Sequence, residues 1–556
     1  MVTLHDISRP TLSGELPVKS EGLPFSQIPH TSKLFADFLF NHSKVQQFYP
    51  RSPYFTEWLK DEAASLRYDP DRRHRVSNIL ERQNRSFGAS AKTLGNVARL
   101  RAGAAAVVTG QQVGLFGGPM FSIYKALTAV RLADVATRSG VESVPVFWLA
   151  TEDHDLAEVN QVLIPAADFS LQGLAASTQS LAGAPVGKVT FGPEIQPVVA
   201  EAAQLLGDSE ITHQLRESYR PGESFGSAFA RLFAKLFADW GVVLLDASDP
   251  ELHRVAEPIY RAAIKRAAEL DDALLARGKE LEAAGYHQQV KVTPSSTLLF
   301  ALKNGARVPV HRRANGNGAG RFVIEEEEVS EAELLDRIAT APQDFSPNVL
   351  LRPVVQDYLL PTLAYTGGTA EVAYFAQAAV AYQALLGRIT PVLPRFSATI
   401  VEAKPQALLD RYKLRFADLF SGPESLRERL AAGTLPKELQ AAFDAAKASQ
   451  EASLAAIREA LARLDKTLVD ASDNAGAKMR HQLESLRTRA ARAELRQTEV
   501  LGRHAELLSN ALYPNKTLQE RQIAGVYLIA RHGKELLTTL YDTVHADCFD
   551  HQVITL

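Results

Sequence analysis

Residues 104–125 read AAAVVTGQQVGLFGGPMFSIYK, and this stretch decides the fold. Its apolar start, 104–108, is typical of a strand buried on both faces of a parallel sheet. A glycine-rich loop follows, and from Pro119 the apolar residues recur at helical spacing, with proline suited to the first turn. A strand, a glycine loop and a helix N-terminus in this order can hold an anion through backbone N–H groups and the helix dipole.

The loop supplies the predicted nucleotide-binding residues, and Lys125, about two turns into the helix, is a predicted catalytic residue. The spacing matches neither G-x-x-x-x-G-K-[ST] nor G-x-G-x-x-G. The alternative is that the glycines only let a tight loop pack under the sheet. The residues assigned to the nucleotide are Gly110, Gln111, Gln112, Gly114, Gly117 and Gly118.

A second apolar run, 144–150, ends in the charged segment Glu152, Asp153, His154 and Asp155. Ligands of open α/β sheets lie beyond the carboxyl ends of the strands. Carboxylates around an imidazole shift one another's pKa values or attract a cation. We therefore predict Asp153, His154 and Asp155 as catalytic and Glu152 as substrate-binding. The alternative is a solvated turn in which an aspartate caps the next helix.

Residues 346–400 return to α/β character. Strands are predicted over 349–351 and 359–365, leading through two glycines into a helix that begins at Thr369. Glu371 lies in the first turn, where a carboxylate also pairs with the dipole for structural reasons alone. Arg395 is a candidate cation for a phosphate or carboxylate, or else a salt-bridge residue. The predicted substrate-binding residues are Arg352, Gln356, Asp357, Gly367, Gly368, Glu371, Tyr374 and Arg395.

The two opening blocks closely resemble the bacillithiol-biosynthesis cysteine-adding enzymes, the BshC family. The resemblance extends to SPNVLLRPVVQDYLLPTLAYTGGTAEVAYFAQ (346–377), VLPRFSATI (392–400) and ALYPNKTLQER (511–521). It implies an α/β fold with a Rossmann-like parallel-sheet core, similar to class I synthetases and nucleotidylyltransferases. The same resemblance implies two inserted connecting segments and an α-helical coiled-coil arm for dimerisation.

The resemblance also implies the reaction, a ligase that adds cysteine to glucosaminyl-malate in bacillithiol biosynthesis. A carboxylate resists attack until its oxygen becomes a good leaving group, so we expect ATP, with magnesium, to activate the cysteine carboxyl. Class I enzymes suggest a cysteinyl-adenylate. Their His-Ile-Gly-His and Lys-Met-Ser-Lys-Ser signatures are absent, so an acyl-phosphate stays open. The alternatives are a nucleotidylyltransferase acting on a small sugar and a non-enzymatic coiled-coil adaptor.

Composition limits the partners and the compartment. The 556 residues predict about three structural units. A net charge of −3 argues against nucleic acid as the main partner. No eighteen-residue apolar run predicts a membrane span. The N-terminus has no apolar signal region, and the one cysteine suits a reducing cytoplasm.

Seven segments are expected along the chain. The motif Gly222-x-Ser224-x-Gly226 matches a nucleophile elbow, but no apolar strand precedes it, so Ser224 is predicted to cap a helix over 225–240. Further predictions are strands at 188–191, 242–246 and 553–556, helices at 251–284 and 517–540, and an Asn/Gly hairpin tip at 314–320. The segments are a helical flank with the first half of the core (1–160), a first insertion (161–240), a core strand and helix (241–287), a β-rich second insertion (288–345), the second half of the core (346–404), the coiled coil (405–512) and a C-terminal return to the core (513–556).

The coiled coil is predicted from two apolar seams at heptad spacing, one over 454–468 and one over 479–507. A turn is expected at 471–476 between two helices of about 35 residues. Such an arm cannot bury itself on one core, so we expect a homodimer.

One possible metal site lies near the C-terminus. His545, Cys548 and His551 form H-x₂-C-x₂-H, which holds zinc-ligand types but matches no standard zinc spacing. We therefore assign no metal ligands and do not expect zinc.

Overall fold

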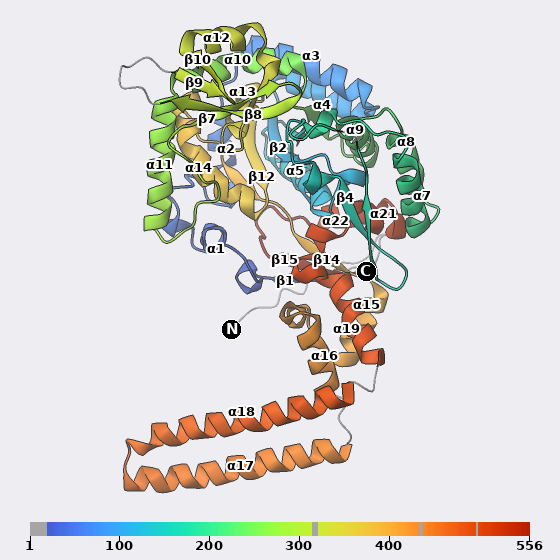
Figure 1. Cartoon of the computed structure of the whole chain (residues 1–556), viewed down its shortest axis with the longest axis vertical. Helices are drawn as coiled ribbons and strands as arrows, with labels where there is room; N and C mark the ends of the chain where they lie inside the picture. The colour runs from blue at the N-terminus through green and yellow to red at the C-terminus, as the bar shows by residue number, and fades with distance from the viewer. Residues whose placement is uncertain (1–18, 179, 314–320, 433–436, 496–498) are drawn as a thin grey trace. The chain divides into compact units, whose positions relative to one another are not determined.

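Five parallel strands form the central sheet of the computed structural model (Figure 1). The structure describes residues 19–178, 180–313, 321–432, 437–495 and 499–556. The sheet order is β13-β12-β2-β3-β6. Its strands are β2 Ala105–Gln111, β3 Ser143–Leu149, β6 Val243–Asp246, β12 Thr362–Gly367 and β13 Val392–Pro394. The Rossmann-like α/β core expected from the sequence is confirmed.

Helices cover both faces of this sheet, which is why β2 and β3 are almost completely buried. Helix α5, Phe121–Arg138, connects β2 to β3 and packs on both strands. The predicted N-terminal helical flank is confirmed. Its helices are α1 Lys33–Phe40, α2 Phe55–Ser65, α3 Pro70–Ser86 and α4 Ala91–Ala102.

Contacts divide the chain into two units. The first contains Met1–Ala167, Leu171–Thr399 and Glu520–Ile554, and the second contains Asp168–Ser170, Ile400–Gln519 and Thr555–Leu556. All the predicted site residues belong to the first unit.

The first insertion is mixed rather than regular. Ser224 caps α9, Phe225–Leu236, through a hydrogen bond from the Ser227 N–H, as predicted. The strand predicted at 188–191 is reduced to one antiparallel bridge between Thr190 and Ser224, because Val186–Lys188 form a 3-10 turn in which Gly187 lies against Thr151. The remaining elements are α6 Leu156–Val159, β4 Gln161–Pro165, β5 Leu171–Ala175, α7 Ile195–Leu206 and α8 Glu210–Ser218.

The predicted helix 251–284 is two helices, α10 Pro250–Lys265 and α11 Ala267–Ala283. The backbone leaves helical geometry at Arg266, with φ −106° and ψ 16°. The Arg266 guanidinium there binds Glu269 and the carbonyl of Ala384. The apolar pattern continues across this break, so periodicity could not detect it.

The second insertion is an antiparallel sheet of order β10-β9-β8-β7-β11, and its β-rich character is confirmed. One helix, α12, lies between β10 and β11 in the chain. The hairpin tip predicted at 314–320 lies outside the described residues. The elements are β7 Ser296–Lys303, β8 Ala306–Arg313, β9 Arg321–Ile324, β10 Glu327–Ser330, α12 Glu331–Thr340 and β11 Phe345–Pro347.

The predicted strand 349–351 is wrong, and 352–359 is the helix α13, Arg352–Leu359. The Asn348 side chain accepts hydrogen bonds from the N–H groups of Leu350 and Leu351, and Pro353 occupies the first turn. Arg352, Gln356 and Asp357 therefore lie on a helix. The next helix, α14 Thr369–Leu386, begins where the glycine pair predicted it.

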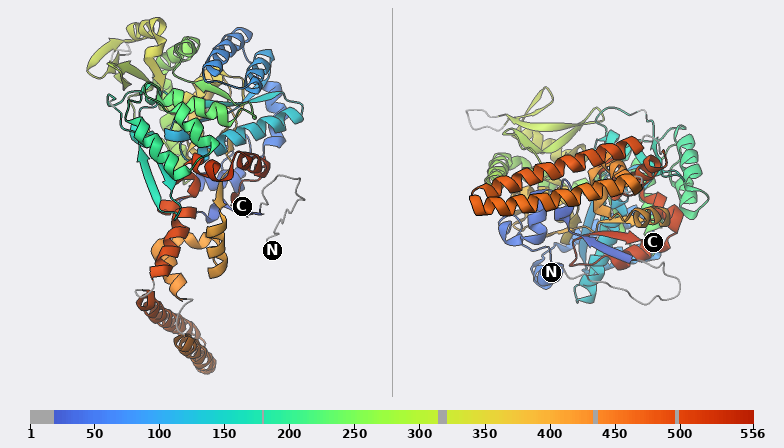
Figure 2. Two further views of the ribbon diagram at one scale, coloured as in Figure 1. Left: turned by 90° about the vertical axis from the view of Figure 1, so that its right-hand side faces the viewer. Right: turned by 90° about the horizontal axis from the view of Figure 1, so that it is seen from below.

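In the second unit, α17 Lys437–Leu464 and α18 Leu468–Leu495 run side by side as an antiparallel hairpin (Figure 1, Figure 2). Each helix has 28 residues. The turn is at 465–467, where Asp465 accepts hydrogen bonds from Thr467, so the turn predicted at 471–476 is wrong. The other helices are α15 Ala403–Tyr412, α16 Pro423–Ala432 and α19 Glu499–Leu512.

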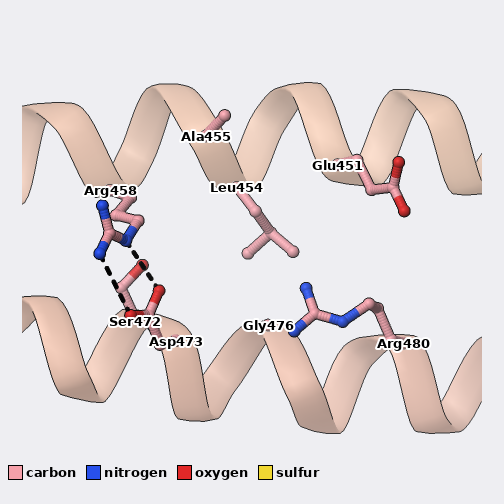
Figure 3. A pocket seen from close by; sticks show the side chains of 8 residues that line it. All are labelled: Glu451, Leu454, Ala455, Arg458, Ser472, Asp473, Gly476 and Arg480. Atoms are coloured by element: carbon pink, nitrogen blue, oxygen red, sulfur yellow. Dashed lines mark hydrogen bonds and ion pairs between the residues drawn. The ribbon is translucent and has the colours of Figure 1, made fainter. Parts of the chain in front are cut away.

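Figure 3 shows the contact between the two long helices. Leu454 of α17 faces Gly476 of α18, where an added Cβ would lie 3.2 Å from the leucine. Arg458 donates to Asp473 at 2.8 Å beside them, and a small pocket of about 160 Å³ lies between the helices. Small residues at 471–476 thus allow close helix packing rather than a turn.

The predicted helix 517–540 is three short helices, α20 Gln519–Gln522, α21 Gly525–His532 and α22 Glu535–Thr543. The chain is extended at 523–524 because Ile523 accepts from the Met120 N–H and Ala524 donates to Leu163. The last strand, β15 His551–Thr555, lies between β1 Lys19–Leu23 and β14 Ala398–Val401 in a separate three-stranded sheet. The C-terminal segment was expected to return to the core, but β15 pairs with β1 and β14 and does not join the central sheet.

Candidate functional site

The two opening sequence blocks meet at one edge of the central sheet. Gln111, the last residue of β2, pairs in register with Leu149 of β3. Gln112 then donates from Nε2 to Asp153 Oδ2 at 2.8 Å and to Glu158 Oε2 at 2.8 Å. The glycine loop and the acid–imidazole segment are therefore in direct contact, as the parallel order of the strands predicts.

The glycine loop uses its backbone amides inside the protein. Phe116, Gly117 and Gly118 have φ values of 50°, 84° and 71°, so the chain turns sharply through the left-handed region. The Gly117 N–H donates to the Tyr219 hydroxyl at 3.1 Å, and the Gly118 N–H donates to the Leu115 carbonyl. At the start of α5 the Met120 N–H donates to Ile523.

The tight-loop alternative therefore describes Gly114, Gly117 and Gly118, whose amides all have partners within the chain. These three N–H groups are bonded within the chain, so the nucleotide-binding role of their glycines stays a prediction. Gly110 is part of β2, and its carbonyl accepts from Lys125. The half-buried side chains of Gln111 and Gln112 remain the predicted nucleotide contacts at this turn.

Lys125 joins the first glycine turn to the second. Its Nζ lies 2.7 Å from the Gly110 carbonyl, 2.7 Å from Gln111 Oε1 and 2.6 Å from Glu371 Oε2. The side chain is 4% exposed, and burial lowers the Lys125 pKa to about 8 although Glu371 opposes the shift. All three ammonium protons have acceptors, so Lys125 holds the two turns together.

Glu371 is a largely buried carboxylate, 17% exposed, at the start of α14. Its oxygens accept from the Tyr365 hydroxyl at 2.5 Å and from the Gly368 N–H at 2.7 Å. Burial raises the Glu371 pKa, but Lys125 and the two hydrogen bonds outweigh burial and leave the pKa below its usual value. The structural role foreseen for a first-turn carboxylate is observed, together with an ion pair that the sequence pattern did not indicate.

The predicted substrate-binding residues of α13 lie beside this carboxylate. Arg352 donates to the Tyr374 hydroxyl at 2.7 Å and to Gln356 Oε1 at 3.2 Å. Gln356 in turn donates to Asp357 at 2.9 Å, and both of these side chains are buried. Glu371 acts electrostatically on both Arg352 and Tyr374, which links this group to the carboxylate.

Arg395 is paired with Glu520, which the sequence analysis did not single out. Two guanidinium nitrogens donate to the carboxylate at 2.6 and 3.1 Å, and both side chains are buried. The salt-bridge alternative is therefore the observed one. Both Nη atoms of the Arg395 guanidinium donate hydrogen bonds to the described part of the chain, whereas its Nε has no partner there. This Nε lies beside Gly368.

The acid–imidazole segment divides into solvent-facing and buried parts. Asp155 caps α6 by accepting from the Glu158 N–H at 3.2 Å, as the capping alternative foresaw. Asp153 accepts from the His154 N–H at 2.7 Å as well as from Gln112. The His154 side chain is 40% exposed, and its Nδ1 lies 3.4 Å from Nη1 of Arg307.

The Glu152 side chain is 13% exposed and contacts a buried pair of residues that sequence reasoning missed. Its Oε1 lies 3.3 Å from Nε2 of His253, and His253 Nδ1 lies 3.2 Å from the Tyr260 hydroxyl. Burial raises the Glu152 pKa to about 8, although Arg307 opposes the shift. Burial also lowers the His253 pKa to about 4, so both groups are mainly neutral near pH 7.

Within the described ranges, no three His, Cys, Asp or Glu side chains are grouped to hold a metal ion. Both ring nitrogens of His551 are taken by Ser397 and Thr399, at 2.7 and 2.9 Å. Every helix in those ranges is too short or too polar to cross a lipid bilayer.

Comparison with known families was made on the whole chain. Residues 21–396 match the model "Bacillithiol biosynthesis BshC, N-terminal Rossmann-like domain". Residues 398–556 match "Bacillithiol biosynthesis BshC, C-terminal coiled-coil domain".

Curated relatives extend over nearly the full length, and each is named "Putative cysteine ligase BshC". The protein of Koribacter versatilis is 50% identical over 96% of this chain and 99% of its own length. The protein of Solibacter usitatus is 38% identical over 96% and 98%. The protein of Salinibacter ruber is 33% identical over 94% and 96%.

Proposed function

This chain belongs to the bacillithiol-biosynthesis BshC family, and from that premise we propose that it is an ATP-dependent cysteine ligase. The reaction joins the carboxyl group of cysteine to the amine of glucosaminyl-malate. Family membership and the names of the relatives support the ligase class. The observation that carries the proposal is the hydrogen bond from Gln112 to Asp153, which joins the glycine turn to the charged strand end.

The chemistry requires an activated carboxyl group, a positioned amine and a proton acceptor. ATP supplies the activation by turning a carboxyl oxygen into a phosphate leaving group. Arg352, with Tyr374, offers donors for the carboxylate of a substrate. Asp153 and His154 reach solvent at the end of β3, where they can bind the ammonium group of a substrate.

Other residues act by holding this arrangement. The Lys125–Glu371 ion pair fixes the ends of β2 and β12 relative to each other. Since the donor set does not form a protein-held metal site, we derive no step through magnesium. An adenylate and an acyl-phosphate are both compatible with these residues.

The proposal includes a homodimer through the helical hairpin. Ile457, Leu464, Met479 and Leu486 are 52%, 79%, 50% and 57% exposed, respectively. Apolar side chains at heptad positions on a two-helix hairpin are suited to pairing with a second copy. Sedimentation of the full chain tests this, with Leu464→Ser and Leu486→Ser expected to weaken self-association.

Mass spectrometry of a reaction with ATP, cysteine and glucosaminyl-malate tests the function. We expect a product equal to the two substrates less one water, with AMP for an adenylate or ADP for an acyl-phosphate. Cysteine-dependent exchange of pyrophosphate into ATP would identify the adenylate route. Adenylyl transfer to a sugar without amide formation would instead indicate a nucleotidylyltransferase. An inert chain, with Asp153→Asn and His154→Ala equally inert, would favour an adaptor.

A further inference from the structure

The structure contains a buried chain of three polar side chains at the edge of the proposed site. Glu152 follows β3, whereas His253 and Tyr260 lie on α10. Their side chains are linked in series, with Glu152 Oε1 3.3 Å from His253 Nε2 and His253 Nδ1 3.2 Å from the Tyr260 hydroxyl. His253 and Tyr260 are 4% and 2% exposed.

The protonation states give this chain a direction. Burial raises the Tyr260 pKa well above its usual value, so the hydroxyl keeps its proton. Burial also lowers the His253 pKa to about 4, so the imidazole carries one N–H and one lone pair. In the tautomer in which Tyr260 donates to the lone pair on Nδ1, the ring proton is on Nε2, which lies 3.3 Å from Glu152 Oε1.

We propose that Glu152 is the proton acceptor for the attacking amine, and that His253 and Tyr260 are positioning residues that hold its carboxyl group. This rests on the function proposed above. In that reaction a C–N bond forms between the amine nitrogen and the activated carbonyl carbon. The bond from this carbon to the phosphate oxygen breaks, and its electron pair leaves with the phosphate. The amine proton passes to Glu152 Oε2, which later releases it to water.

The surrounding charges agree with this role. Arg307, Lys188 and Arg352 favour the ionised form of Glu152, whereas Asp246 and burial oppose it. Lys188 and Asp249 act on His253 in opposite directions, and the backbone carbonyls of Phe345 and Ala247 also face its ring. A base poised near neutral pH is the most effective kind of general base.

The pH dependence of kcat/KM tests whether His253 donates toward Glu152 in this series of three side chains. We expect kcat/KM of the full chain to rise through a pKa near 8, the value to which burial raises Glu152. His253→Phe removes the N–H that stabilises the carboxylate, so the profile should move up by about one pH unit or more, a tenfold loss at pH 7. His253→Gln, whose amide can still donate, should restore most of the profile. Tyr260→Phe should give a smaller shift in the same direction.

Tyr49→Phe is the matched control, because Tyr49 is equally buried and donates only to the Val372 carbonyl at 2.8 Å. Its profile should equal that of the unmodified chain. A pH profile of kcat/KM that stays the same or moves to lower pH in His253→Phe would overturn the proposal.

Infrared difference spectra against Glu152→Gln, recorded without substrates, separate this inference from the proposed function. A protonated-carboxyl band that disappears near pH 8, and at higher pH in His253→Phe, supports the relay. If the band shifts in this way but the protein makes no amide, the ligase proposal fails, whereas the coupling of Glu152 to His253 stands. A band that is absent at pH 7, or that is indifferent to His253→Phe, overturns the relay whatever the activity.

Discussion

Two partly buried glutamates at the same edge of the sheet are held in opposite charge states. Glu371 has a lowered pKa because Lys125 and two hydrogen bonds outweigh its burial. Glu152 has a pKa raised to about 8 because its direct partner is the neutral His253 and burial prevails. Burial alone therefore does not decide the charge of a carboxyl group. The charge of its direct partner decides it.

Lys125→Met should produce the largest effect. The substitution leaves Glu371 as a buried charge without its cation, so we expect the free energy of unfolding to fall by about 3–5 kcal/mol in urea titrations. The double variant Lys125→Met/Glu371→Gln should recover much of this loss, because neither charge is then buried alone. His253→Gln, which removes no charge from Glu152, should cost far less. Equal losses from Lys125→Met and His253→Gln would contradict the comparison.

Tyr365→Phe should have an intermediate effect. The Tyr365 hydroxyl donates to the ionised Glu371, and hydrogen bonds to charged groups contribute about 1.5–3 kcal/mol. Tyr49→Phe removes an equally buried hydroxyl whose acceptor is the neutral Val372 carbonyl, so about 0.5–1.5 kcal/mol is expected. Thermal and urea unfolding of both variants would measure the difference. A Tyr49→Phe loss as large as that of Tyr365→Phe would mean that Glu371 is not ionised.

The sequence could predict the parts of this site that are local in the chain. An apolar run followed by glycines or charges places Gln112 and Asp153 at neighbouring strand ends, because parallel strands end on the same edge. Glu371 at a helix start is equally local. The helical segment 352–359 was missed because its short apolar run also fits a strand, although Pro353 marks a first turn.

The partners of these residues could not be predicted. His253 and Arg307 approach the charged segment from about 100 and 150 positions away, and no local pattern marks either. Glu520 was within the stretch that resembles the family, but its pairing with Arg395 depends on tertiary packing. The charge state of a buried group depends on such distant partners, which is why the difference between Glu152 and Glu371 emerges only from the structure.

Glu152→Gln should be visible as a change in the pH dependence of the free energy of unfolding. Between pH 4.5 and about 8 the folded chain keeps a proton that the unfolded chain has released, so the free energy of unfolding falls as pH rises. His253 makes the free energy of unfolding rise with pH between about pH 4 and 6.5, where the unfolded chain binds one more proton than the folded chain. The two slopes cancel below pH 6.5 and leave the Glu152 slope, about 1.4 kcal/mol per pH unit, up to pH 8. Because His253 contributes equally to both proteins, urea titrations from pH 6 to 8.5 should show Glu152→Gln gaining stability relative to the unmodified chain steadily up to about pH 8 and levelling off above it. Glu459→Gln, at an exposed position of α17, should give a flat difference. A flat difference for Glu152→Gln as well would show that Glu152 is ionised like Glu371, and the contrast between the two carboxyl groups would be lost.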